Sequence, residues 1–556
     1  MPDAVLFRKA KPLDDPTTRY PGFNPRVTTL KKDAVVHEGT LPLPCDIVFE
    51  QDVAVPLRDG TIIYADIFCP VGGTNLPTIV AWSPYGKQLG TSLLDDIPGR
   101  YGVPKDASSG LEKWEGPDPA YWCAHGYAIV NPDARGAYMS EGDIHFQGTQ
   151  EGQDGSDLIE WIAAREWSNG KIGMSGNSWL GICQWYIAAE RPPHLAAIAP
   201  WEGFTDFYRE THYRGGIADF AFNEKITSEM SGNNRVEDVP AMSKLHPLLD
   251  AYWADKIAGL EKISIPAYVV ASWTNGLHTP GTFNGYQRIA SPNKWLRVHN
   301  THEWPDYYDP HHRADLHRFF DRYLKGIDNG WERTPRVRVS LFDPPLADEV
   351  DRAAQDYPLS QTRFTPLYLN ATTHTLSQAP VPEAAASSYN TDDDGNAIFS
   401  IHFDHALELV GPVKLRLWVE ATDADDMDVF VLLQKLDADG NVLAPVSFEP
   451  GWTGPHGRLR ASHRELDAQR STPAQPFHTH ASEQRLSAGQ IVPLDIGLTP
   501  IGMRWHPGQQ LRIIIAGYNP ALLKFDWTVG PKTRNTGRHT IHAGGQYDSH
   551  LLVPII

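Results

Sequence analysis

One stretch, residues 170–189, runs from a short apolar segment into a helix-like segment through a turn of small residues. The turn reads Ser175-Gly-Asn-Ser178-Trp-Leu-Gly181, so a glycine stands two residues before Ser178 and another three residues after it. A sharp strand-to-helix turn needs neighbours without bulk, and it exposes the oxygen of its central serine. The segment therefore predicts a nucleophilic serine, with Ser178 favoured over Ser175. An ordinary glycine-lined turn between a strand and a helix is the alternative.

The rest of the first 330 residues has the pattern of an α/β domain. Five short apolar runs are typical of strands buried on both faces, namely 77–82, 126–130, 170–174, 267–272 and 294–298. Helical spacing at 153–164 and 282–289 separates some of these runs, which implies parallel crossovers. Residues 46–69 alternate apolar and polar around Arg58-Asp-Gly60, as an antiparallel hairpin does.

A chain of 556 residues is long enough for two or three domains. The strand pattern lapses from Ala199 to about Lys262, where three helical segments (204–210, 217–230 and 242–260) predict an insertion over the sheet. After Thr334 short alternating strands follow, for example at 337–342, 413–421, 428–436 and 511–517, and they predict an antiparallel β-sandwich. We therefore predict an α/β domain from 1–203 and 263–334, a helical cap at 204–262, and a β-sandwich domain at 335–556.

Charge and cysteine content exclude several classes of protein. The chain has 49 Lys and Arg residues against 68 Asp and Glu residues, a net charge of −19, so binding to nucleic acids or anionic membranes is not expected. No run approaches the 18 apolar residues of a membrane span, and the first 22 residues lack the pattern of a secretory signal. Four cysteines without a CxxC pair exclude a disulfide scaffold, so we expect a cytoplasmic protein.

Several longer motifs carry a resemblance to a known family. They are Gly126-Tyr-Ala-Ile-Val-Asn-Pro-Asp-Ala-Arg-Gly136, Glu166-Trp-Ser-Asn-Gly-Lys-Ile-Gly-Met174, Gly176-Asn-Ser-Trp-Leu-Gly181 and Arg538-His-Thr-Ile-His-Ala-Gly-Gly-Gln-Tyr-Asp-Ser-His550. The chain resembles the cocaine-esterase and X-Pro dipeptidyl-peptidase (CocE/NonD) family of serine hydrolases over nearly its whole length. That family has a Gly-x-Ser-Tyr-x-Gly turn, and here Trp179 replaces the tyrosine. The resemblance implies an α/β-hydrolase fold with a helical cap and a C-terminal jelly roll.

The resemblance also implies a catalytic triad in the chain order serine, acid, histidine. The run 294–298 is followed by His299-Asn-Thr-His302-Glu-Trp304, so the general base is predicted to be His299 or His302. A branch of the family with a similar pattern has its histidine where His299 stands, five residues before Trp304. We therefore favour His299 and keep His302 as the alternative.

The triad acid departs from the family pattern. The family has an aspartate after the strand predicted at 267–272, whereas this chain has Asn275. An amide can hold an imidazole in one tautomer, but it offers no charge to stabilise the imidazolium. Three explanations stay open. Asn275 is the working third member, another carboxylate such as Glu303, Asp306 or Asp309 replaces it, or the site is catalytically weakened.

Two groups are candidates for the oxyanion hole. The backbone N–H of Trp179 follows the nucleophile directly, as such donors do. The resemblance adds the hydroxyl of Tyr85, which lies in a Pro-Tyr segment after the strand at 77–82. The aromatic residues Trp114, Trp201, Phe204 and Phe207 are candidates for an acyl pocket, and core packing is the alternative for each.

These features predict a serine hydrolase that cleaves a carboxylic ester, or an amide, of a small molecule through an acyl-serine intermediate. No metal or organic cofactor is expected, and a homo-oligomer is possible. The alternatives are an acyltransferase, an X-Pro dipeptidyl-peptidase or acylase, and a binding protein with a weakened triad. The sequence shows no marker for ammonium recognition, so the esterase is favoured.

Overall fold

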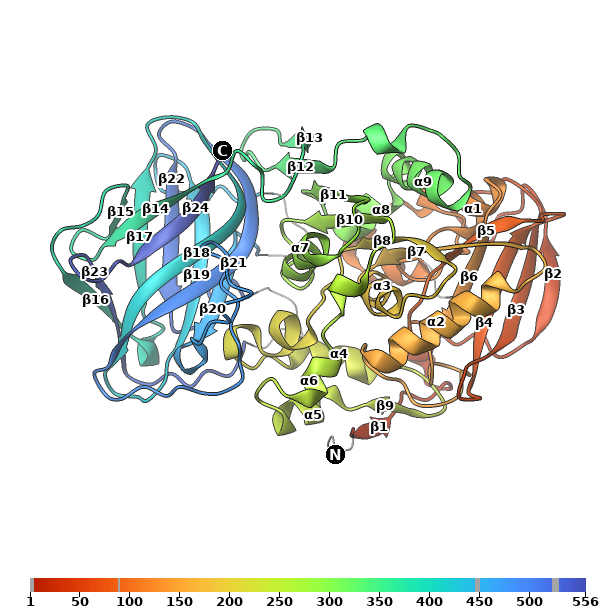
Figure 1. Cartoon of the computed structure of the whole chain (residues 1–556), viewed down its shortest axis with the longest axis horizontal. Helices are drawn as coiled ribbons and strands as arrows, with labels where there is room; N and C mark the ends of the chain where they lie inside the picture. Colours follow the sequence, from red (N-terminus) through yellow and green to blue (C-terminus); the bar gives the residue numbers. More distant parts are fainter. Residues whose placement is uncertain (1–4, 89–90, 446–450, 523–529) are drawn as a thin grey trace.

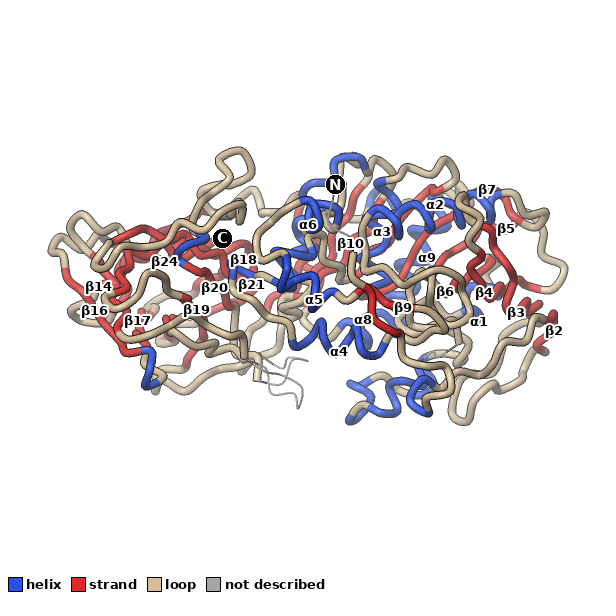
Figure 2. Tube along the Cα trace, turned by 90° about the horizontal axis from the view of Figure 1, so that it is seen from below, coloured by secondary structure: helices blue, strands red, loops and turns tan. Residues whose placement is uncertain are grey.

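The computed structural model describes residues 5–88, 91–445, 451–522 and 530–556. Figure 1 shows an N-terminal sheet flanked by helices, a C-terminal β domain at the opposite end, and the cap helices between them. In the view of Figure 2 the C-terminal strands gather at one end, and helices α4 and α5 lie between that end and the N-terminal sheet. The two sheets therefore belong to separate parts of the molecule, and the cap helices lie between them.

The N-terminal sheet has eleven strands in the order β13-β12-β11-β10-β8-β7-β5-β6-β4-β3-β2. Their bounds are β2 Arg26–Leu30, β3 Ile47–Pro56, β4 Ile62–Pro70, β5 Leu76–Val80, β6 Ala128–Asp133, β7 Ser168–Asn177, β8 Leu195–Trp201, β10 Ala267–Ser272, β11 Lys294–His299, β12 Val337–Leu341 and β13 Glu349–Ala354. The neighbouring strands of the central part of this sheet, β12-β11-β10-β8-β7-β5-β6, pair in parallel. The predicted α/β sheet and the hairpin β3–β4 are thus confirmed.

Helices cover both faces of this sheet because their apolar residues repeat at helical spacing. They are α1 Pro119–Ala124, α2 Thr149–Ala163, α3 Trp179–Ala189, α7 Thr279–Arg288, α8 Glu303–Tyr308 and α9 Pro310–Leu324. Helix α9 shows the rule, since Leu316, Phe319 and Phe320 are buried. The carboxylate of Asp309 caps its first turn by accepting the N–H groups of His311 and His312.

The cap lies between β8 and β10. It contains α4 Ala221–Glu229, β9 Arg235–Glu237, α5 Val239–Leu245 and α6 Ala251–Asp255, together with short helical turns such as Tyr208–His212. Its helices are shorter than the predicted segments. Strand β1, Phe7–Lys9, pairs antiparallel with β9, so the N-terminal segment joins the cap, which the sequence pattern did not indicate.

The C-terminal strands form a second sheet in the order β16-β23-β18-β21-β20-β19-β22-β17-β15-β14-β24. A further pairing between β18 and β24 closes this sheet on itself as a barrel. The bounds are β14 Arg363–Asn370, β15 Thr375–Ser377, β16 Ala385–Asn390, β17 Asn396–His402, β18 Leu407–Ala421, β19 Asp428–Leu436, β20 His456–Arg460, β21 Ile491–Trp505, β22 Gln510–Ala516, β23 Arg538–Ala543 and β24 His550–Ile555. The predicted β domain is confirmed, and the jelly-roll topology stays a prediction.

The boundary predicted at residue 335 needs correction. Strand β12 was expected in the β-sandwich, but it pairs in parallel with β11 of the first sheet. Its side chains Val337, Val339 and Leu341 are fully buried there, because alternation alone does not tell which of two sheets a strand joins. The β domain therefore begins after β13.

All four cysteines are free thiols. Within the described ranges, no helix combines the length and apolar character that crossing a membrane requires.

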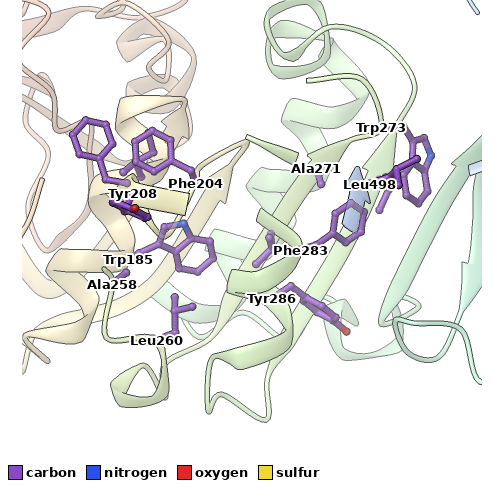
Figure 3. Packing of buried hydrophobic residues seen from close by; sticks show 14 of the residues in the cluster. Trp185, Phe204, Tyr208, Ala258, Leu260, Ala271, Trp273, Phe283, Tyr286 and Leu498 are labelled. Carbon is purple, nitrogen blue, oxygen red and sulfur yellow. The ribbon is translucent and has the colours of Figure 1, made fainter. Parts of the chain in front are cut away.

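Trp273, which follows β10, packs the α/β domain against the β domain. Figure 3 shows its ring beside Leu498, with Phe283 of α7 close by. Its Nε1 donates to the carbonyl of Ser340 over 2.6 Å. A Cβ on Gly502 would lie 2.5 Å from Trp273 Nε1, so the ring needs a glycine opposite it.

We predict that Gly502→Ala lowers the free energy of unfolding by about 1–3 kcal/mol, because the added methyl overlaps a rigid, enclosed ring. Gly497→Ala is the matched control on the same strand, since its Cβ would meet Pro476 at 3.5 Å. Denaturant unfolding of both variants measures the difference. Equal losses would show that the Trp273 contact is not tight.

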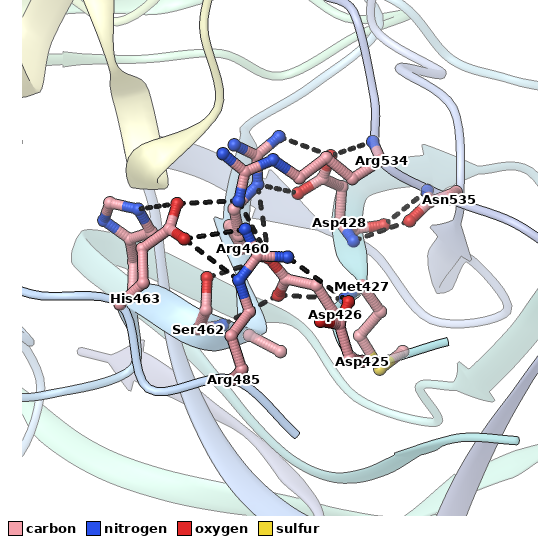
Figure 4. Close-up of polar contacts among 12 residues, drawn as sticks. Asp425, Asp426, Met427, Asp428, Arg460, Ser462, His463, Arg485, Arg534 and Asn535 are labelled. Atoms are coloured by element: carbon pink, nitrogen blue, oxygen red, sulfur yellow. Dashed lines mark hydrogen bonds and ion pairs between the residues drawn. The ribbon is translucent and has the colours of Figure 1, made fainter. Parts of the chain in front are cut away.

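Buried histidines line the contact between the cap and the β domain. His463 Nδ1 lies 2.9 Å from His480 Nδ1, and a Cβ on Gly216 of the cap would lie 2.7 Å from Nδ1 of His463. Figure 4 shows His463 beside the ion pairs that Arg460 makes with Asp428 at 2.7 and 2.8 Å. Burial, with the charge of Arg460, lowers the pKa of His463 to about 4.

This pKa predicts a loss of stability in acid. A histidine whose folded pKa is lowered stays neutral while the unfolded chain takes up a proton, so stability falls as the pH drops from about 6.5 towards 4, by up to about 1.4 kcal/mol per pH unit. His463→Asn should make the fall of Tm between pH 6.5 and 4 shallower. His402→Asn, an exposed change, should leave the slope unaltered. An unchanged slope in His463→Asn would contradict this account.

Candidate functional site

Ser178 lies at the junction between β7 and α3. Its backbone has φ 54° and ψ −122°, a strained conformation for a residue other than glycine. A Cβ on Gly176 would lie 2.5 Å from Leu180 Cβ, and a Cβ on Gly181 would lie 2.7 Å from the carbonyl of Trp201. The two glycines that the sequence analysis identified are therefore sterically required. Ser178 is half-buried and lines a cavity.

The imidazole at hydrogen-bond distance from Ser178 is His278. Its Nε2 lies 3.1 Å from Ser178 Oγ. The ring stacks on Phe204, with centroids 5.9 Å apart. Burial, together with the positive charge of Arg214, lowers the pKa of His278 to about 3, so the ring is neutral near pH 7. Its Nδ1 has no hydrogen-bond partner among the described residues.

Asn275 shapes the loop that carries His278. Its Oδ1 accepts the backbone N–H groups of Leu277, at 3.2 Å, and His278, at 3.3 Å. Its Nδ2 donates to Oε2 of Glu303 over 3.3 Å. The structure thus brings Asn275 and Glu303 to the site, but Asn275 holds the backbone of His278 rather than its ring.

His299, the favoured base, lies elsewhere. Its Nε2 is 2.6 Å from Oε1 of Glu202 and its Nδ1 is 3.7 Å from Asp306. Because this ring is paired with Glu202, the structure does not bring His299 to Ser178 Oγ, and the expected pairing is not seen. The alternative, His302, accepts the N–H of Trp304 through Nδ1 and stacks on Tyr101.

Two of the alternative acids are also engaged in other contacts. Asp306 forms an ion pair with the buried guanidinium of Arg297, one of whose bonds is 2.9 Å long, and it also contacts His312 at 3.0 Å. Asp309 caps α9, as described above. Neither carboxylate is placed on the His278 ring, and Glu303, the third of these alternatives, contacts Asn275.

The two predicted oxyanion donors lie beside the nucleophile. The hydroxyl of Tyr85, just after β5, hydrogen-bonds the side chain of Ser178. Burial raises the pKa of Tyr85 well above its usual value, so the hydroxyl keeps its proton and can donate. The N–H of Trp179 is the first of helix α3 and has no acceptor within the helix. Its indole donates to Glu151 over 2.7 Å, which fixes the ring.

A cavity of about 1840 Å³ opens over Ser178. Its walls come from the α/β domain, the cap and the β domain, and include Tyr85, Trp114, His278, Arg214 and His456. Of the four aromatic residues proposed for an acyl pocket, Trp114 lines the cavity.

The other three are not among its lining residues. Trp201 packs under the site against Tyr268 and Tyr307. Phe204 and Phe207 stack on each other in the core. Core packing, the alternative stated for each, is what the structure shows for them.

The sequence analysis missed His278, although a signal was present. The residue lies three positions after Asn275 in the loop that follows β10, where the carboxyl ends of the parallel strands meet. Because the expected order places the histidine after the acid, and the acid position is Asn275, the histidine was predicted in the next loop along the chain. Within the described part of the chain no group of three or more His, Cys, Asp or Glu residues is placed to hold a metal ion.

Comparisons with known proteins show which families and proteins the chain is similar to. The X-Pro dipeptidyl-peptidase (S15 family) matches residues 59–244, and the X-Pro dipeptidyl-peptidase C-terminal non-catalytic domain matches residues 329–552. Cocaine esterase from Rhodococcus sp. (strain MB1 Bresler) is 24% identical over 91% of this chain and 98% of its own length.

Solved structures extend the likeness. An α-amino acid ester hydrolase, at 17% identity and a TM-score of 0.67 over 95% of this chain and 98% of its own, shares the fold. A CocE/NonD family hydrolase from Staphylococcus aureus is 36% identical, with a TM-score of 0.87, over 92% of this chain and 94% of its own. At that identity and coverage, the chain belongs to the CocE/NonD family of hydrolases, which resembles the X-Pro dipeptidyl-peptidases.

Proposed function

We propose that the protein is a serine hydrolase that cleaves carboxylic esters through an acyl-serine intermediate, with His278 as its general base. The contact of 3.1 Å between His278 Nε2 and Ser178 Oγ carries this proposal. Nucleophile and base within hydrogen-bond reach, at a strained turn that opens into a cavity, are the parts that acyl transfer needs. The names of the relatives, esterases and peptidases, support the same class of reaction.

Each step uses a group already described. Neutral His278 accepts the proton of Ser178, and the serine oxygen attacks the ester carbonyl. The Tyr85 hydroxyl and the Trp179 N–H stabilise the oxyanion. The imidazolium then protonates the leaving alcohol, and water, activated by the same ring, releases the acid from Ser178.

The third member of the triad is where this site departs from a Ser-His-Asp triad. With no carboxylate on His278 Nδ1 among the described residues, the imidazolium lacks its usual partner, and the nearby Arg214 disfavours its charge. We therefore propose that chemistry is slower than in a full Ser-His-Asp site.

The jelly-roll topology, a homo-oligomer, and a cytoplasmic location, which the four free thiols favour, remain our proposals.

The first test compares two histidines. We predict that Ser178→Ala abolishes labelling by a fluorophosphonate probe and hydrolysis of p-nitrophenyl acetate. His278→Gln should lower kcat about 10²- to 10⁴-fold, the usual contribution of a general base. His299→Gln is the matched control, and it should keep most of the activity because its ring is paired with Glu202. The reverse order of the two losses would reject His278 as the base.

The low pKa of His278 predicts an unusual pH profile. Because the base must be neutral and its pKa is about 3, log kcat/KM for p-nitrophenyl acetate should stay level from pH 8 down to about 5. An ordinary histidine would give a fall centred near 6.5. Circular dichroism at each pH checks that the protein is folded. A midpoint at 6–7 in folded protein would contradict the role of this ring.

Asn275→Asp tests whether the amide is a degraded acid. The structure predicts a loss of turnover, about tenfold, because the new carboxylate would face Glu303 across 3.3 Å and like charges at this range disfavour the ionised pair. Asn275→Asp with Glu303→Gln should restore turnover, since one carboxylate and one amide are again opposed. A gain in Asn275→Asp alone would show that the family acid works at this position.

A further inference from the structure

One buried polar atom in the cavity is used by no step above. Glu115 lines the cavity with Ser178 and Tyr85, and it is 4% exposed. Its Oε1 accepts the indole N–H of Trp304 over 2.9 Å. Its Oε2 is buried without a hydrogen-bond partner among the described residues, which is costly for a carboxyl group unless a ligand supplies the bond.

The backbone of Glu115 is tied to the residue that precedes the nucleophile. Its backbone is in the left-handed region, with φ 62°, and its carbonyl accepts the N–H of Asn177 over 3.2 Å. Asn177 directly precedes Ser178. The carboxyl group also acts electrostatically on Tyr85, whose hydroxyl bonds Ser178. Glu115 therefore lines the same cavity as Tyr85 and is close enough to act on its charge.

The surroundings favour an uncharged ligand. Burial, with the charge of Glu202, raises the pKa of Glu115, which favours the neutral acid. Aromatic rings flank it: Trp114 lies 4.9 Å from Trp304 between centroids, and Tyr101 lies 5.4 Å from Trp304. A neutral carboxyl group both donates and accepts a hydrogen bond, and a hydroxyl group matches both roles.

We propose that Glu115 determines specificity by hydrogen-bonding a hydroxyl group of the substrate, so that the preferred substrates are esters of hydroxylated alcohols or hydroxy acids. This inference rests on the proposed function. It follows from the unpaired Oε2 of a residue that lines the cavity with Ser178, since a site built to bond a hydroxyl discriminates against the analogue that lacks it.

Isosteric ester pairs test the proposal. On the alcohol side, 2-hydroxyethyl butyrate is compared with n-propyl butyrate by pH-stat titration. On the acyl side, p-nitrophenyl 3-hydroxybutyrate is compared with p-nitrophenyl 3-methylbutyrate. In each pair a methyl replaces the hydroxyl. We expect kcat/KM to favour the hydroxylated member at least about tenfold in one pair.

Two variants separate hydrogen bonding from charge and from packing. Glu115→Gln keeps a donor and an acceptor, so the preference should persist. Glu115→Leu should remove it while the methyl analogue is still cleaved. Asp96→Asn, an exposed cavity residue paired with Arg19, should not alter the preference. If Glu115→Leu does not fold, the wild-type ratios alone decide.

Several outcomes would overturn the proposal. Equal kcat/KM within both pairs, or a preference that survives in Glu115→Leu, rejects the assignment. A preference for choline butyrate over its isostere 3,3-dimethylbutyl butyrate that Glu115→Gln abolishes would identify a cation site instead. Failure of wild type to cleave any ester, with no label on Ser178, rejects the proposed function rather than this inference alone.

Discussion

The steric fit at the turn between β7 and α3 is the constraint on which the site depends. Ser178 holds a left-handed φ of 54° only because Gly176 and Gly181 leave room for Leu180 and for the carbonyl of Trp201. The turn places the serine oxygen at the carboxyl edge of the sheet, where the loop after β10 delivers His278. Both side chains are positioned by backbone elements, so little side-chain entropy opposes their contact.

The β domain is part of this arrangement. Trp273, at the start of the His278 loop, packs against Gly502 of β21. Residues of the β domain such as His456 also line the cavity over Ser178. The second domain therefore packs against the loop that carries the base and forms one side of the substrate cavity, although it supplies none of the groups in the proposed chemistry.

Electrostatics inside the cavity are arranged around neutral groups. Burial lowers the pKa of His278 and raises those of Tyr85 and Glu115. All three groups are consequently favoured in their uncharged forms. They can donate or accept a proton or a hydrogen bond, and no charged side chain has to be removed from water when the substrate binds. Asn275 fits this pattern, since an aspartate there would add a second negative charge opposite Glu303.

The sequence by itself determined the α/β sheet, the insertion after β8, the β domain and the serine, because periodicity and glycine spacing are local properties. It also indicated Trp179 by its place directly after the serine, and Tyr85 through the family resemblance. Only the tertiary structure decided that β12 joins the first sheet, that His278 rather than His299 meets Ser178, and that Glu115 is a cavity residue with an unpaired buried oxygen. These contacts depend on which loops converge at one edge of a sheet. Local sequence patterns do not determine the distances between such loops.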